Sequence, residues 1–362
     1  MMSNATTQEK SARPLGVVGS LAAGFEMVGR HLGLIVLPVL IDLFLWLGPR
    51  VSIAPLVEQF AAFLLAQSAP DPKTIDQVTQ AVQMLKQLGE QSNLFSLLSA
   101  LPLLNVPSLL AQHAPGALSP LGQPHVMLTT SVLAVMAWGS VLVPVGLALG
   151  FLYLNSLARW VRAMRSPDQQ KLALKRTAAP VPSGVEEPAL SQVEVADPVV
   201  EESSSSGKFI RVFLFAAGVL MVGVVLVPLW MLLVGASVAL VPLLGFLVWS
   251  LGIGVGSYAI LHLLFVVPGV LLGGRGLLRA IWESILLIHT QFPSVVGLIL
   301  LVVLIYQGLG FVWSLPSGDS WSLLVGILGN GCIATGLTAA FFVFYQERVG
   351  QLVGGAQVRA KT

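Results

Sequence analysis

The sequence predicts an all-α membrane protein, a bundle of six transmembrane helices with additional interfacial helices. Two observations lead to this prediction. No charged residue interrupts the chain between Arg211 and Arg275, whereas an apolar run beyond about 18 residues is typical of a helix that spans a bilayer. The composition agrees, because the chain is 55% hydrophobic and 10% charged, against roughly 25% charged residues in ordinary soluble domains.

Residues 1–31 are expected to form a cytoplasmic N-terminus and an interfacial helix. The apolar run that begins near residue 32 is long and has no small-residue cleavage site. These features favour an uncleaved first span over a secretory signal peptide.

Apolar stretches mark the spans in order. The clear candidates are 32–49, 131–157, 211–234, 293–314 and 321–345. The remaining block, 235–274, would be about 60 Å long as one straight helix, twice the roughly 30 Å of the hydrocarbon core. It must therefore hold either one broken span or two short ones, and its prolines and glycines are where it could break.

The positions of Lys and Arg decide between one and two crossings, because these residues are enriched in cytoplasmic loops. With one crossing of 235–274, only Arg50, Lys73 and Lys86 lie outside the cytoplasm. With two crossings, every basic residue after residue 274 also moves outside. We therefore expect six spans in a bacterial inner membrane, with both termini on the cytoplasmic side. Residues 235–245 would then form an outer turn or a partial insertion.

This topology divides the chain into regions. A first transmembrane hairpin covers 32–162 and contains an extracytoplasmic helical insertion at 50–127. Residues 163–207 are rich in Pro, Ser and Glu, cannot bury a core, and are predicted to be a disordered cytoplasmic linker. A four-span membrane domain at 208–350 and a cytoplasmic tail at 351–362 follow.

One stretch of the insertion is more apolar than its surroundings. Residues 93–110 are strongly apolar but contain Pro102 and Pro107, which disfavour a continuous helix. We expect this stretch to lie in the outer interface or to pack over the mouth of the bundle.

Asp42 is the residue of the candidate spans with the clearest potential for function. A carboxylate at the bilayer centre costs about 2.5–3.5 kcal/mol on insertion scales, so intramembrane acids are functional candidates. Asp42 could bind a proton or cation with His262 as a partner. Alternatively, it could lie at the headgroup level near Trp46 and Arg50, or hydrogen-bond a neighbouring helix. For His262, a hydrogen bond between helices is favoured over a ligand role, because no His, Cys or acid lies three or four residues away.

A further interfacial helix is expected at 276–291. Arg279 and Glu283 lie four residues apart, the spacing at which opposite charges pair on a helix. Such a helix could anchor the chain at the membrane surface, and the alternative is that it binds lipid headgroups.

Two stretches of the chain share an outline, and a third, 208–223, has the same outline without the acid. In 21–41 and in 277–301, an amphipathic turn with an aromatic–Glu pair precedes a span, and a histidine follows the acid by five or six residues, as His31 and His289 do. The outline indicates either an internal repeat of an interfacial helix and a hairpin, or independent amphipathic segments at the same membrane face.

The remaining motifs indicate packing rather than chemistry. Gly146 and Gly150 form a GxxxG pair, and small residues recur over 329–340; both patterns favour close backbone approach. The glycines of 252–256 follow no strand, which argues against a nucleotide loop, and no P-loop, zinc-protease or serine-hydrolase motif occurs. With Cys332 as the single cysteine, no Cys-ligated metal site is available. We predict no catalytic residue, metal or cofactor.

The C-terminal half carries a family resemblance. Ala280 and Ser284 form an Ala-x-x-x-Ser helix before the fifth span, and the last span ends in Phe344, Tyr345 and Arg348. Over 206–350, and loosely over the first two spans, the chain resembles the six-span membrane domain fused to bacterial glycerophosphodiester phosphodiesterases, together with its stand-alone relatives. In the fused members a separate soluble barrel performs the chemistry. The resemblance therefore implies a membrane module and transfers no catalytic residue.

The function expected from these observations is that of a non-catalytic membrane module, which supports partner proteins or organises lipids. Its partners would be the lipid bilayer and a membrane protein or a second copy of the chain; the net charge of +2 gives no reason to expect nucleic acid. The alternative is a transporter of a small or lipophilic solute that uses Asp42. A membrane-bound lipid enzyme is a third hypothesis.

Overall fold

The computed structural model describes residues 16–67, 72–99, 101, 103–112, 119–164, 205–274 and 276–359. Nearly all of the linker predicted at 163–207 lies outside these residues, as does the whole N-terminal segment before residue 16. The structure is 82% helical, which confirms the predicted all-α class.

The elements are named in chain order. The first half contains α1 (Val17–Arg30), η1 (Leu32–Ile35), α2 (Val36–Leu47), β1 (Arg50–Ser52), α3 (Ala54–Gln67), α4 (Pro72–Gln91), η2 (Leu94–Leu98), β2 (Val126–Leu128) and α5 (Val132–Ala163). The second half contains α7 (Ser205–Leu240), α8 (Pro242–Leu263), α9 (Val266–Gly273), α10 (Leu277–Ser314) and α11 (Leu323–Arg359).

The described chain has five helical segments that are long and apolar enough to cross a membrane, or six when the bent pair of α1 with η1–α2 counts as one. A multi-pass membrane protein is therefore confirmed at this level. Pro242–Gly273 forms one candidate span, and Val241, in extended conformation, separates it from α7. Pro242 then occupies the first helical turn, where its missing N–H has no intrahelical partner to lose. The turn falls inside the expected 235–245, in agreement with a single crossing of that block.

Two helices bend where interfacial helices were expected to meet spans. The chain turns by 95° between Arg30 and Leu32. In α10, Gln291 has a non-helical conformation (φ −125°, ψ 25°) two residues before Pro293. Pro293 has no backbone N–H to donate to the preceding helical turn, and its ring crowds the backbone of that turn. The break separates the segment that begins at Leu277 from the span expected at 293–314.

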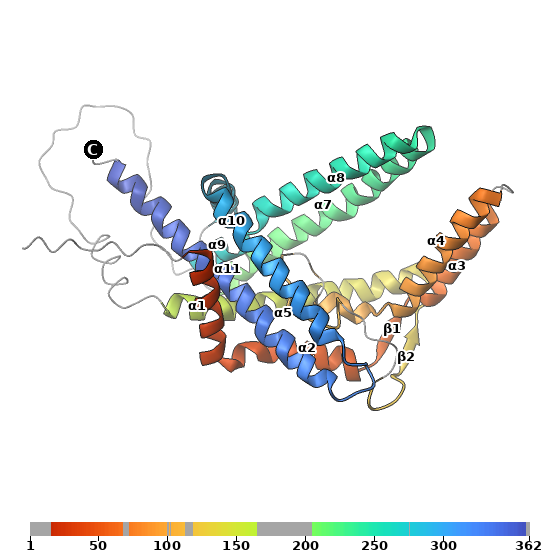
Figure 1. The fold of residues 1–362 in the computed structure, drawn as a ribbon, viewed down its shortest axis with the longest axis horizontal. Helices are drawn as coiled ribbons and strands as arrows, with labels where there is room; N and C mark the ends of the chain where they lie inside the picture. The colour runs from red at the N-terminus through yellow and green to blue at the C-terminus, as the bar shows by residue number, and fades with distance from the viewer. Residues whose placement is uncertain are drawn as a thin grey trace, which may run out of the picture.

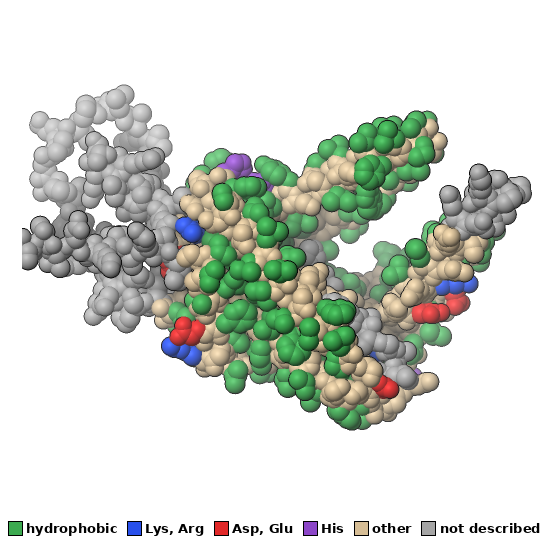
Figure 2. Space-filling view, viewed as in Figure 1, with side chains coloured by type: hydrophobic (Ala, Val, Ile, Leu, Met, Phe, Trp, Pro, Cys, Tyr) green, Lys and Arg blue, Asp and Glu red, His purple; other side chains and the backbone are tan. Residues whose placement is uncertain are grey.

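The bundle has two ends (Figure 1). At one end lie α1, the last turns of α5 and the C-terminal part of α11. At the opposite end, the α3–α4 hairpin projects from the bundle, and β1 pairs with β2 in a parallel two-stranded sheet that joins the two ends of the insertion. The α7–α8 hairpin projects separately. Hydrophobic side chains cover the bundle and this hairpin, whereas the charged ones gather towards the two ends (Figure 2).

Helix α11 is the central helix of the fold and packs against α1, α2, α5, α9 and α10. Its small residues permit this, as the sequence predicts. A Cβ atom added at Gly24 of α1 would lie 2.5 Å from the Gly336 carbonyl oxygen and 2.7 Å from the Ala340 backbone nitrogen. A Cβ atom at Gly336 would meet the ring of Phe25 at 2.5 Å. At Gly24 the backbone of α1 therefore lies directly on the backbone of α11, and at Gly336 the Phe25 ring of α1 does.

Candidate functional site

The apolar stretch that follows α4 enters the bundle. Within it, Leu101, Leu104, Val106 and Leu109 are each at most 3% exposed, although the described residues after η2 form no regular helix. We call the described residues of this stretch, 94–99, 101 and 103–112, the inserted segment. Its η2 turn packs chiefly against α5, and Leu101, Leu104 and Leu109 belong to the same hydrophobic core as residues of α2, α5 and α11.

The glycine pair of α5 receives the inserted segment. A Cβ atom at Gly146 would lie 2.8 Å from the Leu97 carbonyl oxygen, and one at Gly150 would collide with the carbonyl oxygen of Leu104. Both glycines lie near the middle of the 32-residue α5, so the segment reaches the depth of the middle of a candidate span. This differs from both expected positions, in the outer interface and over the mouth of the bundle. Irregular backbone is tolerated at such depth where protein surrounds it, as the burial of this segment shows.

Asp42 holds the inserted segment in place. Its side chain, in α2, is fully buried. The Ser108 hydroxyl and the Leu110 backbone N–H (3.1 Å) donate to Oδ1, and the Leu109 backbone N–H (3.0 Å) donates to Oδ2. The Ser108 hydroxyl oxygen in turn accepts from the Ala111 N–H at 3.0 Å. We call Asp42 with residues 108–110 the carboxylate latch.

The hydrogen bonds of the carboxylate latch distinguish between the roles that the sequence allowed for Asp42. A carboxylate that accepts these converging donors is satisfied within the protein. His262 is not one of its hydrogen-bond partners, so the structure does not form the expected Asp42–His262 pair. The hydrogen bond to a neighbouring segment, which the sequence analysis left open, is the arrangement observed. The partner is an irregular segment rather than a helix.

A pocket of about 210 Å³ adjoins the latch. Leu45 and Leu110 contribute its apolar wall, and polar residues from the end of α4 and from η2, together with Arg50, face them. Burial lowers the pKa of the Arg50 guanidinium from its ordinary value, and arginine stays charged in proteins nonetheless. The pocket therefore has a mixed polar and apolar lining.

His262 lies at the end of α8, where the chain breaks before α9. Its Nδ1 lies 2.8 Å from the Tyr258 carbonyl oxygen, and its ring is 5.2 Å from that of His289 on α10, between centroids. Sequence reasoning missed this pair, because a search three or four residues away cannot find a side chain from another helix. The one available signal was the recurrence of a histidine after the aromatic–Glu pairs.

Ser284 fixes the α8–α9 break to α10. Its fully buried hydroxyl donates to the His262 carbonyl oxygen at 2.6 Å and accepts from the Phe265 backbone N–H at 3.3 Å. We expect Ser284→Ala to lower the free energy of unfolding by about 1–3 kcal/mol, because it leaves both backbone groups unpaired. Thermal unfolding in detergent measures this. Ser250→Ala removes an exposed hydroxyl of α8 that bonds its own helix and should change nothing; an equal loss in both variants would contradict the bridging role.

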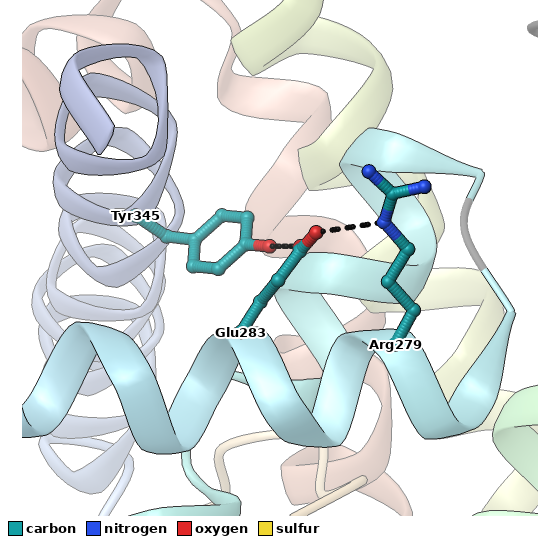
Figure 3. A network of polar contacts seen from close by, with 3 residues as sticks. All are labelled: Arg279, Glu283 and Tyr345. Carbon is teal, nitrogen blue, oxygen red and sulfur yellow. Dashed lines mark hydrogen bonds and ion pairs between the residues drawn. The ribbon is translucent and has the colours of Figure 1, made fainter. Parts of the chain in front are cut away.

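The expected Arg279–Glu283 pair is present and extends to a third residue (Figure 3). Arg279 Nε donates to Glu283 Oε1 at 3.2 Å, and the Tyr345 hydroxyl of α11 donates to Glu283 Oε2 at 3.3 Å. The Arg279 side chain is 58% exposed, so its ion pair contributes little stability. The network's role is to connect α10 with α11 at one end of the bundle.

The residues that carry the family resemblance gather around α9. Ala280 is fully buried and lies against Gly269, as does the Tyr345 hydroxyl. The Phe265 ring stacks on those of Phe344 and Tyr345, each with a centroid distance of 6.0 Å. These residues pack α9, α10 and α11 against one another.

Comparisons with known proteins found no matching family model, no similar curated protein and no similar solved structure. The resemblance described above therefore stays a prediction. Among the described residues, no group of three or more His, Cys, Asp or Glu side chains could hold a metal ion.

Proposed function

We propose that this chain is a non-catalytic module of a bacterial cytoplasmic membrane, which presents the α7–α8 hairpin to lipid or to a partner membrane protein. The carrying observation is that this hairpin packs mainly on itself. The buried residues of α7 are Lys208, Val212, Phe215 and Ala216 near its start and Ser237 near its end; the buried residues of α8 are Gly245 and His262. Between these ends, most apolar side chains of both helices are exposed or half-buried.

Glycines of α8 hold the hairpin together. A Cβ atom at Gly245 would collide with Val238, and one at Gly252 would collide with the Trp230 ring. A Cβ atom at Gly254 would meet nothing within 4 Å. Close contact between α7 and α8 therefore leaves their outer faces to the surroundings, where an apolar surface meets lipid tails or another transmembrane helix.

The alternative, a transporter that uses Asp42, has less support. A transported ion or solute needs polar groups that are free to exchange partners, and the Asp42 carboxylate is engaged by the latch. The pocket beside the latch is the observation that keeps this alternative open. A cytoplasmic position of both termini and the resemblance to the phosphodiesterase-linked membrane domain are parts of the same proposal.

Native mass spectrometry of the protein released from native-lipid nanodiscs tests the proposal. We expect a stoichiometric partner subunit, a second copy or a specific lipid to remain bound. Gly252→Ala forces α7 and α8 apart at Trp230, so the fraction of protein that carries the bound partner or lipid should fall. The matched variant Gly254→Ala should keep the wild-type fraction. A bare protein would contradict the module. If reconstituted protein then supported solute uptake, and Asp42→Asn abolished that uptake, the transporter hypothesis would replace the module hypothesis.

A further inference from the structure

Two histidines from different helices meet beside the α8–α9 break. The ring centroids of His262 and His289 are 5.2 Å apart and the ring planes are tilted by 57°. Tyr258 lies against His262 on the same helix, with ring centroids 4.1 Å apart. Histidine side chains reach the surface where α8 and α10 approach each other (Figure 2).

The hydrogen bonds of both rings identify their tautomer. Nδ1 of His262 lies 2.8 Å from the Tyr258 carbonyl oxygen, and Nδ1 of His289 lies 2.9 Å from the Ile285 carbonyl oxygen. A carbonyl oxygen only accepts, so Nδ1 carries the proton in each ring. In the neutral ring Nε2 then holds a free lone pair. This arrangement, with Nδ1–H donated to a backbone carbonyl, is the usual support of a metal-ligating histidine.

The Nε2 atom of His262 lacks a partner within the described part of the chain. The residue is 9% exposed, and Nε2 is buried without a hydrogen bond. Buried polar atoms are nearly always paired, so an unpaired one indicates a function or an unseen ligand. Ser284 holds the backbone of His262 against α10, which also carries His289. The two rings are therefore positioned before any ligand binds.

The ring separation matches a shared metal ion. With a metal–nitrogen bond of about 2.0–2.1 Å and a tetrahedral angle, the two imidazole centroids lie about 5 Å apart. The observed separation of the His262 and His289 centroids is 5.2 Å. We propose that His262 and His289 bind one borderline transition-metal ion, of the Zn²⁺ or Cu²⁺ class that imidazole favours, through their Nε2 atoms.

The proposed site is an open one. Among the described residues no third His, Cys, Asp or Glu joins the pair, so water or an external ligand completes the coordination. Structural zinc sites use four protein ligands. Two protein ligands, of which His262 is buried and His289 is exposed, instead leave coordination positions that external ligands reach from the side of His289. This inference is independent of the membrane-module proposal.

Copper titration of the full chain without a polyhistidine tag tests the site. Electron paramagnetic resonance should show one saturable Cu²⁺ with nitrogen ligands, and Zn²⁺ should displace it. His289→Ala should abolish this signal; His289 is exposed, so the variant is expected to fold. His125→Ala, which removes an exposed histidine of another region, should leave the signal unchanged.

Two results would overturn the inference. One is a copper signal of equal occupancy in the wild type and in His289→Ala, which would assign the metal to other histidines. The other is the absence of saturable binding in the wild type, which would leave the pair as a packing contact. His262→Ala serves as a second variant and should lose the same signal, whereas Tyr258→Phe should retain it.

Discussion

Replacement of Asp42 by alanine is expected to lower the free energy of unfolding by about 3 kcal/mol or more. Ser108 and the N–H groups of Leu109 and Leu110 lose their common acceptor at a fully buried position, and each unsatisfied group costs about 1–3 kcal/mol. The inserted segment would then lose its link to α2. Thermal unfolding in detergent, together with the monodisperse fraction in size-exclusion chromatography, measures the effect.

Asp42→Asn provides a graded comparison. The amide keeps one carbonyl oxygen, but its NH₂ group replaces the other acceptor and faces an N–H donor. We expect a smaller loss than for alanine. Asp319→Ala, at an exposed position, should have no effect. Unchanged stability of both Asp42 variants would show that the latch contributes nothing, and a loss of solute uptake alone would identify Asp42 as functional.

Gly150→Ala is expected to destabilise the protein by about 1–3 kcal/mol, the usual cost of overpacking. The added methyl group would collide with the Leu104 carbonyl oxygen. This neighbour is backbone, so it cannot rotate away as a flexible side chain could. The inserted segment would have to withdraw from α5, and proteolysis at this segment should accelerate as the unfolding midpoint falls.

Gly139→Ala is the matched control in the same helix. A Cβ atom there would meet nothing within 4 Å, and alanine is the better helix former by about 0.8–1.0 kcal/mol. We expect this variant to be as stable as the wild type or more so. Equal behaviour of Gly139→Ala and Gly150→Ala would contradict the position of the inserted segment.

At Asp42, the sequence was enough to identify the residue but not its partners. Asp42 stood out because a charge in an apolar helix is rare, and this needs no structure to recognise. Its partners lie 66 to 68 residues away, in a stretch with prolines and no helical periodicity. Nothing local connects the two, so the sequence could offer a hydrogen bond and a binding site only as alternatives.

The glycines and histidines follow the same pattern. The spacing of Gly146 and Gly150 predicted that backbone would approach α5 closely, but small residues record only the absence of a side chain and cannot identify what approaches. His262 was examined for partners along its own helix, whereas His289 comes from α10. In each case the sequence identified the residue but not the segment that lies against it in the folded chain.

The sequence by itself determined the all-α membrane class, the succession of apolar spans, an interruption within the block 235–274, and the boundary between the helix expected at 276–291 and the span from 293. These features follow from local properties. A bilayer requires each spanning segment to satisfy its own backbone hydrogen bonds, and proline interrupts them wherever it stands. Only the tertiary structure decided that the inserted segment enters the bundle, that Asp42 holds it there, and that two histidines meet. Such contacts join distant residues, and the packing of the whole chain selects them.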